Sequence, residues 1–187
     1  MRLFHFSDNP RIKTFVPRCV FTPTERPVGR EWLNGPLVWA IDEPHQPMYL
    51  FPRECPRILL WPTPQTTKQD LEKYWDGRTC RMIAHVESAW LDRLRTAIIY
   101  RYELADESFE ELDDAGMWVS RTPVEPITIV RLDDLPAQLE AQNVELRVVE
   151  SLVPLRSMWN TSLHASGIRL RNSRDWKPPP RGHQLGK

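Results

Sequence analysis

Three short apolar segments of the chain contain polar and aromatic side chains that are suited to ligand contacts. These side chains are His5 and Ser7 in Leu3-Phe4-His5-Phe6-Ser7, Trp39 in the run 37–41, and Trp118 and Ser120 in Met117-Trp118-Val119-Ser120. Burying a polar side chain in an apolar strand costs free energy, so such a group either bonds to a neighbour or serves a ligand. Each also has an ordinary structural interpretation, because a histidine often bonds to backbone and aromatic rings dominate protein cores.

A second source of chemistry is the acidic stretch from Asp106 to Asp114, which contains six carboxylates. Two carboxyl groups can act as acid and base when burial drives their pKa values apart. Nothing in this stretch demands burial, so a solvated acidic loop is the preferred interpretation. The carboxylates kept as candidate catalytic groups are Glu110, Asp113, Asp114 and Glu125.

Cysteine and histidine spacing gives no metal motif. Cys19, Cys55 and Cys80 are widely spaced, without a CxxC pair, so neither a disulfide framework nor a structural zinc site is indicated. We interpret them as reduced thiols. The five histidines are also scattered, and we expect no metal site.

Composition limits the class of protein. The chain has 187 residues, 41% of them hydrophobic, and a formal net charge of zero, so no long-range field draws it to nucleic acid or to an anionic membrane. No apolar run reaches the roughly 20 residues of a membrane span, and the first residues lack the apolar region of a secretion signal. We therefore expect a cytoplasmic protein without membrane contact; these features do not predict its oligomeric state.

The spacing of apolar and turn residues predicts an α+β fold with short helices, since 18 prolines stand against seven glycines. Expected strands cover 2–7, 37–41, 57–61, 81–86, 97–104, 116–121, 127–132, 144–149 and 167–170, and expected helical pieces cover 42–51, 66–77, 88–94, 133–143 and 153–159. Within 97–104, Arg101 and Glu103 are expected to face solvent. Together these elements predict a curved or split, mainly antiparallel sheet in one domain over 1–174, followed by a flexible, Pro-rich basic tail over 175–187.

Two basic regions suggest contacts with phosphate or nucleic acid. The segment 159–172 combines His164 and Arg169 with indole and amide groups, a set that recognises phosphates or bases. The preferred interpretation is a polar loop with a basic edge strand, since charged residues commonly protect sheet edges. The basic chain end is a weak indication of nucleic-acid contact.

The order of these segments resembles the ADP-ribosyltransferase-like superfamily, especially small bacterial members with a histidine in the first motif, and also a bacterial family of unknown function. The resemblance depends on His5 in the first strand, the aromatic strand and helix over 37–51, and the tyrosine-rich strand, acidic loop, Trp-Val-Ser and Pro-Val-x-Pro over 100–126. It implies NAD as substrate, His5 on the nicotinamide ribose with Ser7 beside it, and Trp39 or Tyr49 stacked on nicotinamide. Trp118 and Ser120 would line the same cleft.

The third motif departs from that superfamily's pattern. Its usual glutamate would precede the Trp-Val-Ser strand, where this chain has Met117. An acidic group stabilises positive charge in the transition state, which a thioether cannot do. The resemblance therefore implies NAD or ADP-ribose binding with weak or no transferase or NAD glycohydrolase activity, unless one of the four candidate carboxylates reaches the cleft.

Two alternatives stay open. The first is a non-catalytic binding or regulatory module on the same fold. The second is an RNA 2′-phosphotransferase-like enzyme, which needs cationic side chains facing a phosphate; Arg18, Arg53, Arg121 and Arg169 are available for that role.

Overall fold

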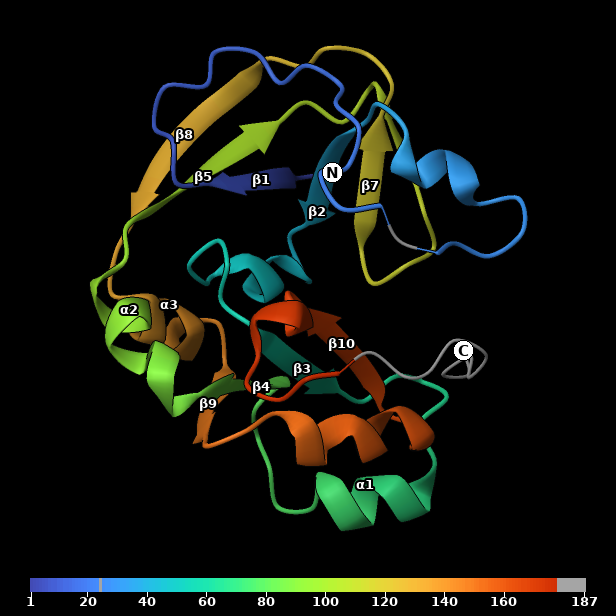
Figure 1. The fold of residues 1–187 in the computed structure, drawn as a ribbon, viewed down its shortest axis with the longest axis vertical. Helices are drawn as coiled ribbons and strands as arrows, with labels where there is room; N and C mark the ends of the chain where they lie inside the picture. Colours follow the sequence, from blue (N-terminus) through green and yellow to red (C-terminus); the bar gives the residue numbers. More distant parts are fainter. Residues whose placement is uncertain (24, 178–187) are drawn as a thin grey trace. The chain divides into compact units, whose positions relative to one another are not determined.

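The structure is a computed structural model that describes residues 1–23 and 25–177. It has an α+β fold with two mainly antiparallel sheets and short helices (Figure 1). The chain forms two compact units, one from Met1–Tyr49 with Ile99–Leu132, the other from Leu50–Ile98 with the residues from Asp133 onward. From residue 178 the predicted basic tail lies outside the described residues.

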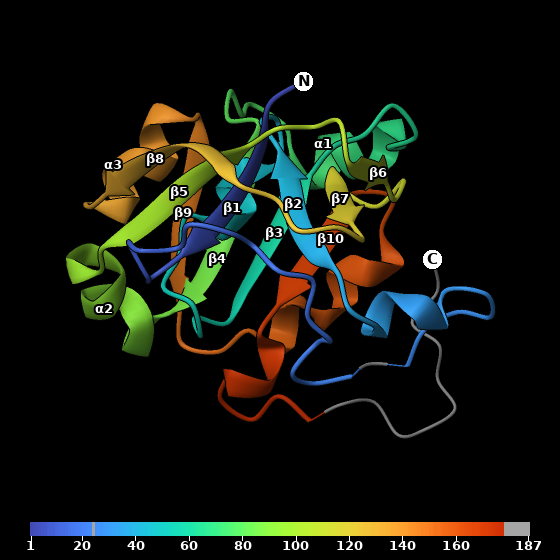
Figure 2. The same ribbon diagram turned by 90° about the horizontal axis from the view of Figure 1, so that it is seen from above.

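The first unit contains a six-stranded antiparallel sheet, visible in Figure 2. Across the sheet the strands are β6 (Phe109–Glu111), β7 (Met117–Ser120), β2 (Val38–Asp42), β1 (Leu3–Ser7), β5 (Ile99–Leu104) and β8 (Pro126–Leu132). Two 3₁₀ helices, Glu31–Asn34 and Gln46–Tyr49, flank β2 in the sequence. Strand β1 lies between β2 and β5. Its apolar residues suit this position, because a strand with neighbours on both sides is more buried than an edge strand.

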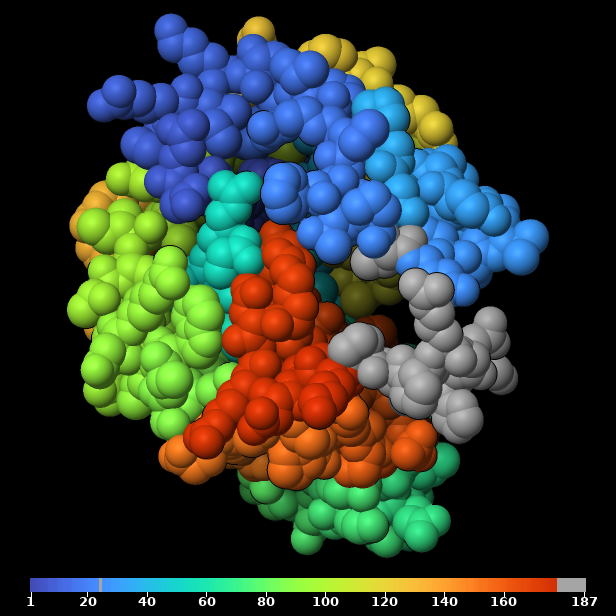
Figure 3. Space-filling view, in the orientation of Figure 1, coloured from blue at the N-terminus to red at the C-terminus, as the bar shows by residue number. Residues whose placement is uncertain are grey.

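One face of this sheet holds the main apolar cluster of the unit. Its buried members are Leu3, Phe15, Val38, Ala40, Tyr102, Leu104, Phe109 and Val124. Leu3 lies opposite Leu104 and His5 opposite Tyr102, so the alternation of β1 places His5 on this same face. The segment 8–36, which the sequence predicts to be irregular, is held to the sheet by bridges from Phe15 to Val124 and from Arg18 to Leu37. Its residues, blue in Figure 3, contribute to the molecular surface, as is usual for connecting segments.

The second unit contains a four-stranded sheet. In order across the sheet its strands are β10 (His164–Ile168), β3 (Arg57–Trp61), β4 (Met82–Glu87) and β9 (Val144–Val149). Its helices are α1 (Lys68–Tyr74), α2 (Leu91–Thr96) and α3 (Leu135–Ala141), with 3₁₀ helices over Ser88–Trp90, Val153–Asn160 and Leu170–Asn172. Strand β9 runs parallel to β4, whereas the other pairs are antiparallel.

Two of the helices, α1 and α3, begin with a side-chain cap. Thr67 accepts a hydrogen bond from the Asp70 amide at the start of α1, and Asp134 accepts one from Ala137 at the start of α3. These contacts satisfy amide groups that have no partner within the helix. None of the helices in the described part of the chain has the length and apolar character to cross a membrane.

Two expectations about elements are wrong. The acidic stretch is not wholly a loop, because Phe109–Glu111 forms β6 and pairs with β7. Phe109 is buried in the core cluster, and its edge position leaves Glu110 and Glu111 in solvent. The last strand is β10, which ends at Ile168, earlier than the predicted 167–170; Arg169 follows in a left-handed conformation with φ 56°, which terminates it.

Arg101 does not simply face solvent, as the alternation of its strand suggested. It is half-buried, with its guanidinium 4.7 Å from the centre of the Phe4 ring. Its Nη1 donates to the Gln46 side-chain oxygen at 2.9 Å. Burial lowers the pKa of Arg101, with the nearby Arg2 adding to the effect. Stacking on an aromatic face and a side-chain acceptor explain how this cation tolerates partial burial.

Candidate functional site

Two hollows in the first unit share His5 and Trp39. The first hollow has a volume of about 60 Å³. It is lined by Phe4, His5, Phe6, Trp39, Ala40, Ile41, Tyr49 and Met117. The second hollow has a volume of about 150 Å³. It is lined by His5, Phe15, Val16, Arg18, Cys19, Val20, Leu37, Val38 and Trp39. The structure therefore brings together the predicted contacts His5, Trp39 and Tyr49 around the first hollow.

The hollows lie where two central strands separate. Strand β1 pairs with β5 from Leu3 to Ser7, but with β2 only at Leu3 and Phe4. Beyond Phe4 the backbones of β1 and β2 do not pair, and the His5 side chain contacts β2 instead. Its Nδ1 lies 2.8 Å from the Trp39 carbonyl oxygen. Because a carbonyl can only accept, Nδ1 carries the proton and a neutral His5 ring has its acceptor at Nε2.

Trp39 lines both hollows and carries a buried indole donor. Its Nε1–H has no hydrogen-bond partner among the residues that the structure describes. The guanidinium of Arg26 lies 6.0 Å from the Trp39 ring, a favourable approach for a cation. Buried donors in native proteins are nearly always paired, so an acceptor supplied from outside the described chain would satisfy this indole.

Tyr49 and Met117 close one side of the first hollow. The Tyr49 hydroxyl donates to the Met117 sulfur at 3.5 Å, a weak hydrogen bond. The Tyr49 ring also stacks on Phe6, with 6.2 Å between centres and 15° between planes. These contacts leave a lining that is mostly aromatic and apolar, as is usual for ligand pockets.

A compact turn after β2 holds Tyr49 in place. The Asp42 carboxylate oxygen Oδ1 lies 2.8 Å from both the backbone nitrogen and Nδ1 of His45. Gly116 packs directly on this pair and has φ +71°. A Cβ at Gly116 would lie 2.3 Å from His45 Nδ1 and 2.5 Å from Asp42 Oδ1, so the turn requires glycine there.

Three other predicted contacts line neither hollow. The Ser120 hydroxyl lies 3.1 Å from both the Ser108 hydroxyl and the Thr122 carbonyl oxygen, and the Ser7 hydroxyl accepts from the Asn9 amide. Trp118 packs against the main apolar cluster, on the same face of the sheet as His5. Its indole Nε1–H is also buried and has no partner in the described part of the chain. These residues share a sheet with the hollows but do not form their walls.

The four candidate carboxylates, all within the described residues, likewise line neither hollow. Glu110 is exposed and pairs with Arg121 at 3.3 Å. Asp113 and Asp114 lie in the turn between β6 and β7, and Glu125 is exposed immediately before β8. The residue nearest the expected catalytic position in the sequence, Met117, brings a thioether into the first hollow.

The walls of the second hollow include residues that sequence reasoning did not single out. Phe15 lies 4.6 Å from the His5 ring, centre to centre, and Cys19 also lines the hollow. Arg18, one of the four arginines that the sequence offers as phosphate ligands, brings a positive charge to the same hollow. These residues fall in the irregular segment 8–36, where no periodic pattern indicates which side chains turn inward.

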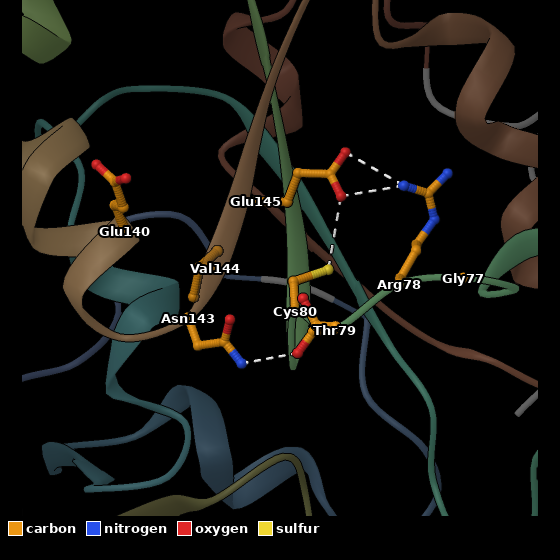
Figure 4. A pocket seen from close by; sticks show the side chains of 8 residues that line it. All are labelled: Gly77, Arg78, Thr79, Cys80, Glu140, Asn143, Val144 and Glu145. Carbon is orange, nitrogen blue, oxygen red and sulfur yellow. Dashed lines mark hydrogen bonds and ion pairs between the residues drawn. The ribbon is translucent and has the colours of Figure 1, made fainter.

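The second unit has a larger hollow, shown in Figure 4, in which several of the polar groups bond to one another. It has a volume of about 340 Å³. The Arg78 guanidinium lies 3.0 Å from the Glu145 carboxylate, and the Cys80 thiol donates to Glu145 at 3.6 Å. Burial, followed by the hydrogen bond to Glu145, raises the pKa of the Cys80 thiol. A protonated thiol is a poor nucleophile, so this cluster is a weak candidate for covalent chemistry.

The other polar clusters of the second unit are also internally paired. Arg169 and Arg171 lie 3.7 and 3.2 Å from the carboxylate of Glu54, and the His164 ring stacks on Trp61 at 4.1 Å. The three cysteines form no disulfide. Within the described residues, no group of three or more His, Cys, Asp or Glu side chains could hold a metal ion.

Comparison with known proteins identifies the family alone. A family model matches residues 4–173. The chain belongs to DUF6886, a family of unknown function. No curated protein and no solved structure matches it. The DUF6886 match covers every residue that lines the first and second hollows.

Proposed function

We propose that this DUF6886 protein binds a nucleotide, NAD or ADP-ribose, at the first and second hollows. The observation that carries the proposal is that Trp39 lines both hollows and holds a buried donor without a partner among the described residues. The first hollow, at about 60 Å³, is far smaller than the roughly 300 to 1,000 Å³ of a pocket that encloses a whole ligand. It would therefore take one flat ring, with the rest of the ligand outside it.

The chemistry of the two hollows fits the parts of a nucleotide. Aromatic side chains around the first hollow suit stacking on a heteroaromatic ring, and a ring carbonyl or carboxamide oxygen would accept from Trp39 Nε1. Arg18 in the second hollow supplies positive charge for a phosphate. His5 stands between the two, where a ribose would lie.

The residues that line the two hollows support binding of NAD without efficient group transfer. Transfer from NAD passes through a positively charged transition state, which a carboxylate stabilises and Met117 does not. The four candidate carboxylates lie outside both hollows. Of the arginines considered for a phosphotransferase, Arg18 lines a hollow whereas Arg121 pairs with Glu110, so nucleotide binding is the better-supported function.

Titration calorimetry with NAD and with ADP-ribose tests the proposal. Trp39→Phe keeps the ring and removes the indole donor, and His5→Ala removes the imidazole. Each should weaken binding roughly two- to tenfold, the typical effect of one hydrogen bond. Trp118→Phe is the matched control, because it removes the other unpartnered buried indole donor without altering a hollow.

The control variant should bind like the wild type. Absence of binding at millimolar NAD and ADP-ribose would contradict the proposal and favour a module that binds another partner. Equal loss in Trp39→Phe and Trp118→Phe would show that the two changes act through stability rather than through ligand contacts.

A further inference from the structure

Strand β8 is an unusually open edge of the six-stranded sheet. It pairs with β5 on one side, and no strand among the described residues pairs with its other side (Figure 1). Five consecutive residues, 127–131, are exposed. The exposed fractions of Ile127, Ile129 and Val130 are 62%, 45% and 38%. Alternate backbone N–H and C=O groups of β8 therefore point outward beside apolar side chains, an arrangement that favours pairing with another strand.

The opposite edge of the same sheet is protected against such pairing. Strand β6 has three residues, and two of them are Glu110 and Glu111. Short length and charge are the usual means by which proteins prevent edge association. Strand β8 has seven residues, with charge only at Arg131 and a proline only at its first position, Pro126. The contrast between the two edges indicates that β8 has a partner.

We propose that β8 pairs antiparallel with β8 of a second copy of this chain, around a two-fold axis at Thr128. The sequence Ile127-Thr128-Ile129 is symmetric about Thr128, so this register places each Ile127 opposite Ile129 of the second copy. The same register places Glu125 opposite Arg131 of the second copy, twice in the dimer. Opposite charges and apolar residues directly across from each other stabilise antiparallel pairs.

The structure also favours a second copy over a charged peptide as the occupant. The chain has a formal net charge of zero, so two copies do not repel one another over long range. A two-fold axis through one edge gives a closed dimer, because each copy uses the only long open edge that this sheet has among the described residues. The result is one continuous sheet across both copies, in which Ile129, opposite Tyr102, extends the face that carries the main apolar cluster.

Cysteine cross-linking of the full chain tests the register. In a background with Cys19→Ser and Cys80→Ser, Thr128→Cys puts a thiol on the axis. Directly paired residues have Cα atoms about 4.5 to 5.5 Å apart, within the range of a disulfide. Val130→Cys is the matched control, since in this register the two copies of residue 130 are offset by about 13 Å along the strands. Mild oxidation should convert Thr128→Cys to a covalent dimer and leave Val130→Cys monomeric on a denaturing gel.

Sedimentation equilibrium of charge variants tests the pairing without cross-linking. Glu125→Arg and Arg131→Glu should each weaken the dimer roughly tenfold, because two attractive pairs become repulsive. The double variant Glu125→Arg/Arg131→Glu should restore the wild-type dissociation constant. A wild-type protein that stays monomeric at about 100 μM, or a Thr128→Cys protein that cross-links no faster than Val130→Cys, would overturn the proposal.

Discussion

His85 should make the folded protein sensitive to mild acid. It lies on β4 with an exposed fraction of 3%, and its Nδ1 has no hydrogen-bond partner within the described residues. Burial first, and then the positive charge of Arg147, lowers the pKa of His85 from 6.5 to about 4. The unfolded chain therefore takes up a proton on this side chain more readily than the folded chain does.

The sign and size of the effect follow from these two pKa values. Because the folded pKa is the lower one, the stabilising contribution of neutral His85 is present above pH 6.5 and is lost as the pH falls toward 4. The full difference corresponds to roughly 3 kcal/mol, at about 1.4 kcal/mol for each pKa unit. About 2 kcal/mol of this should already be lost at about pH 5, where most carboxylates are still ionised.

Urea unfolding of the wild type and of His85→Leu between about pH 7.5 and pH 5 measures this loss. The leucine variant keeps an apolar side chain of similar size and cannot take up a proton, so its free energy of unfolding should fall less over this range by about 2 kcal/mol. Parallel pH profiles for the wild type and His85→Leu would refute the assignment of the acid sensitivity to His85.

Three further changes have defined outcomes. Gly116→Ala should lower the free energy of unfolding by at least roughly 2 kcal/mol in urea titrations, because its methyl group would collide with His45 and Asp42 at a positive φ; a loss near zero would show that the turn relaxes. Cys55 is fully buried, and burial raises its pKa to about 11, so a thiol reagent at neutral pH should label the exposed Cys19 and reach Cys55 only after denaturant is added. Met117→Glu introduces a carboxylate into the first hollow and should raise NAD hydrolysis over the wild type, by up to roughly a hundred- to thousandfold if the group is well placed, as chromatography of released nicotinamide would measure. If the wild type instead hydrolyses NAD briskly and keeps that rate when Glu110, Asp113, Asp114 or Glu125 is neutralised, this result would contradict the inference that a missing carboxylate at Met117 keeps hydrolysis slow.

The sequence predicts individual elements well where local chemistry decides them. The run Arg57–Trp61 is a strand because four of its five residues are apolar, among them the β-branched Ile58 and the aromatic Trp61. Thr67 and Asp134 are residue types that cap helices, and each accepts a hydrogen bond from a helix amide. Strand β6 does not follow from local chemistry, because two of its three residues are glutamates. They fit in a strand there because its edge position leaves their side chains in solvent. That position depends on pairing with β7 and on burial of Phe109, which no local pattern shows.

The candidate site is predictable only in part for the same reason. Segment order brings His5, Trp39 and Tyr49 into consideration, whereas the register that places His5 opposite Tyr102 is seen only in the structure. Strand β1 pairs with β2 only at Leu3 and Phe4, and the segment that contains Phe15 is held to the sheet by its bridge to Val124. Those contacts join residues far apart in the chain and determine which side chains form the second hollow.

The close packing of Gly116 on Asp42 and His45 should also limit how the family can diverge. No side chain fits at this position while the aspartate and histidine keep their contact, so the three residues are expected to change together or not at all. A DUF6886 sequence with any larger residue in place of Gly116 should therefore lack the Asp-His pair and begin its following helical turn differently. Such a sequence would mark a branch of the family in which the wall of the first hollow has changed.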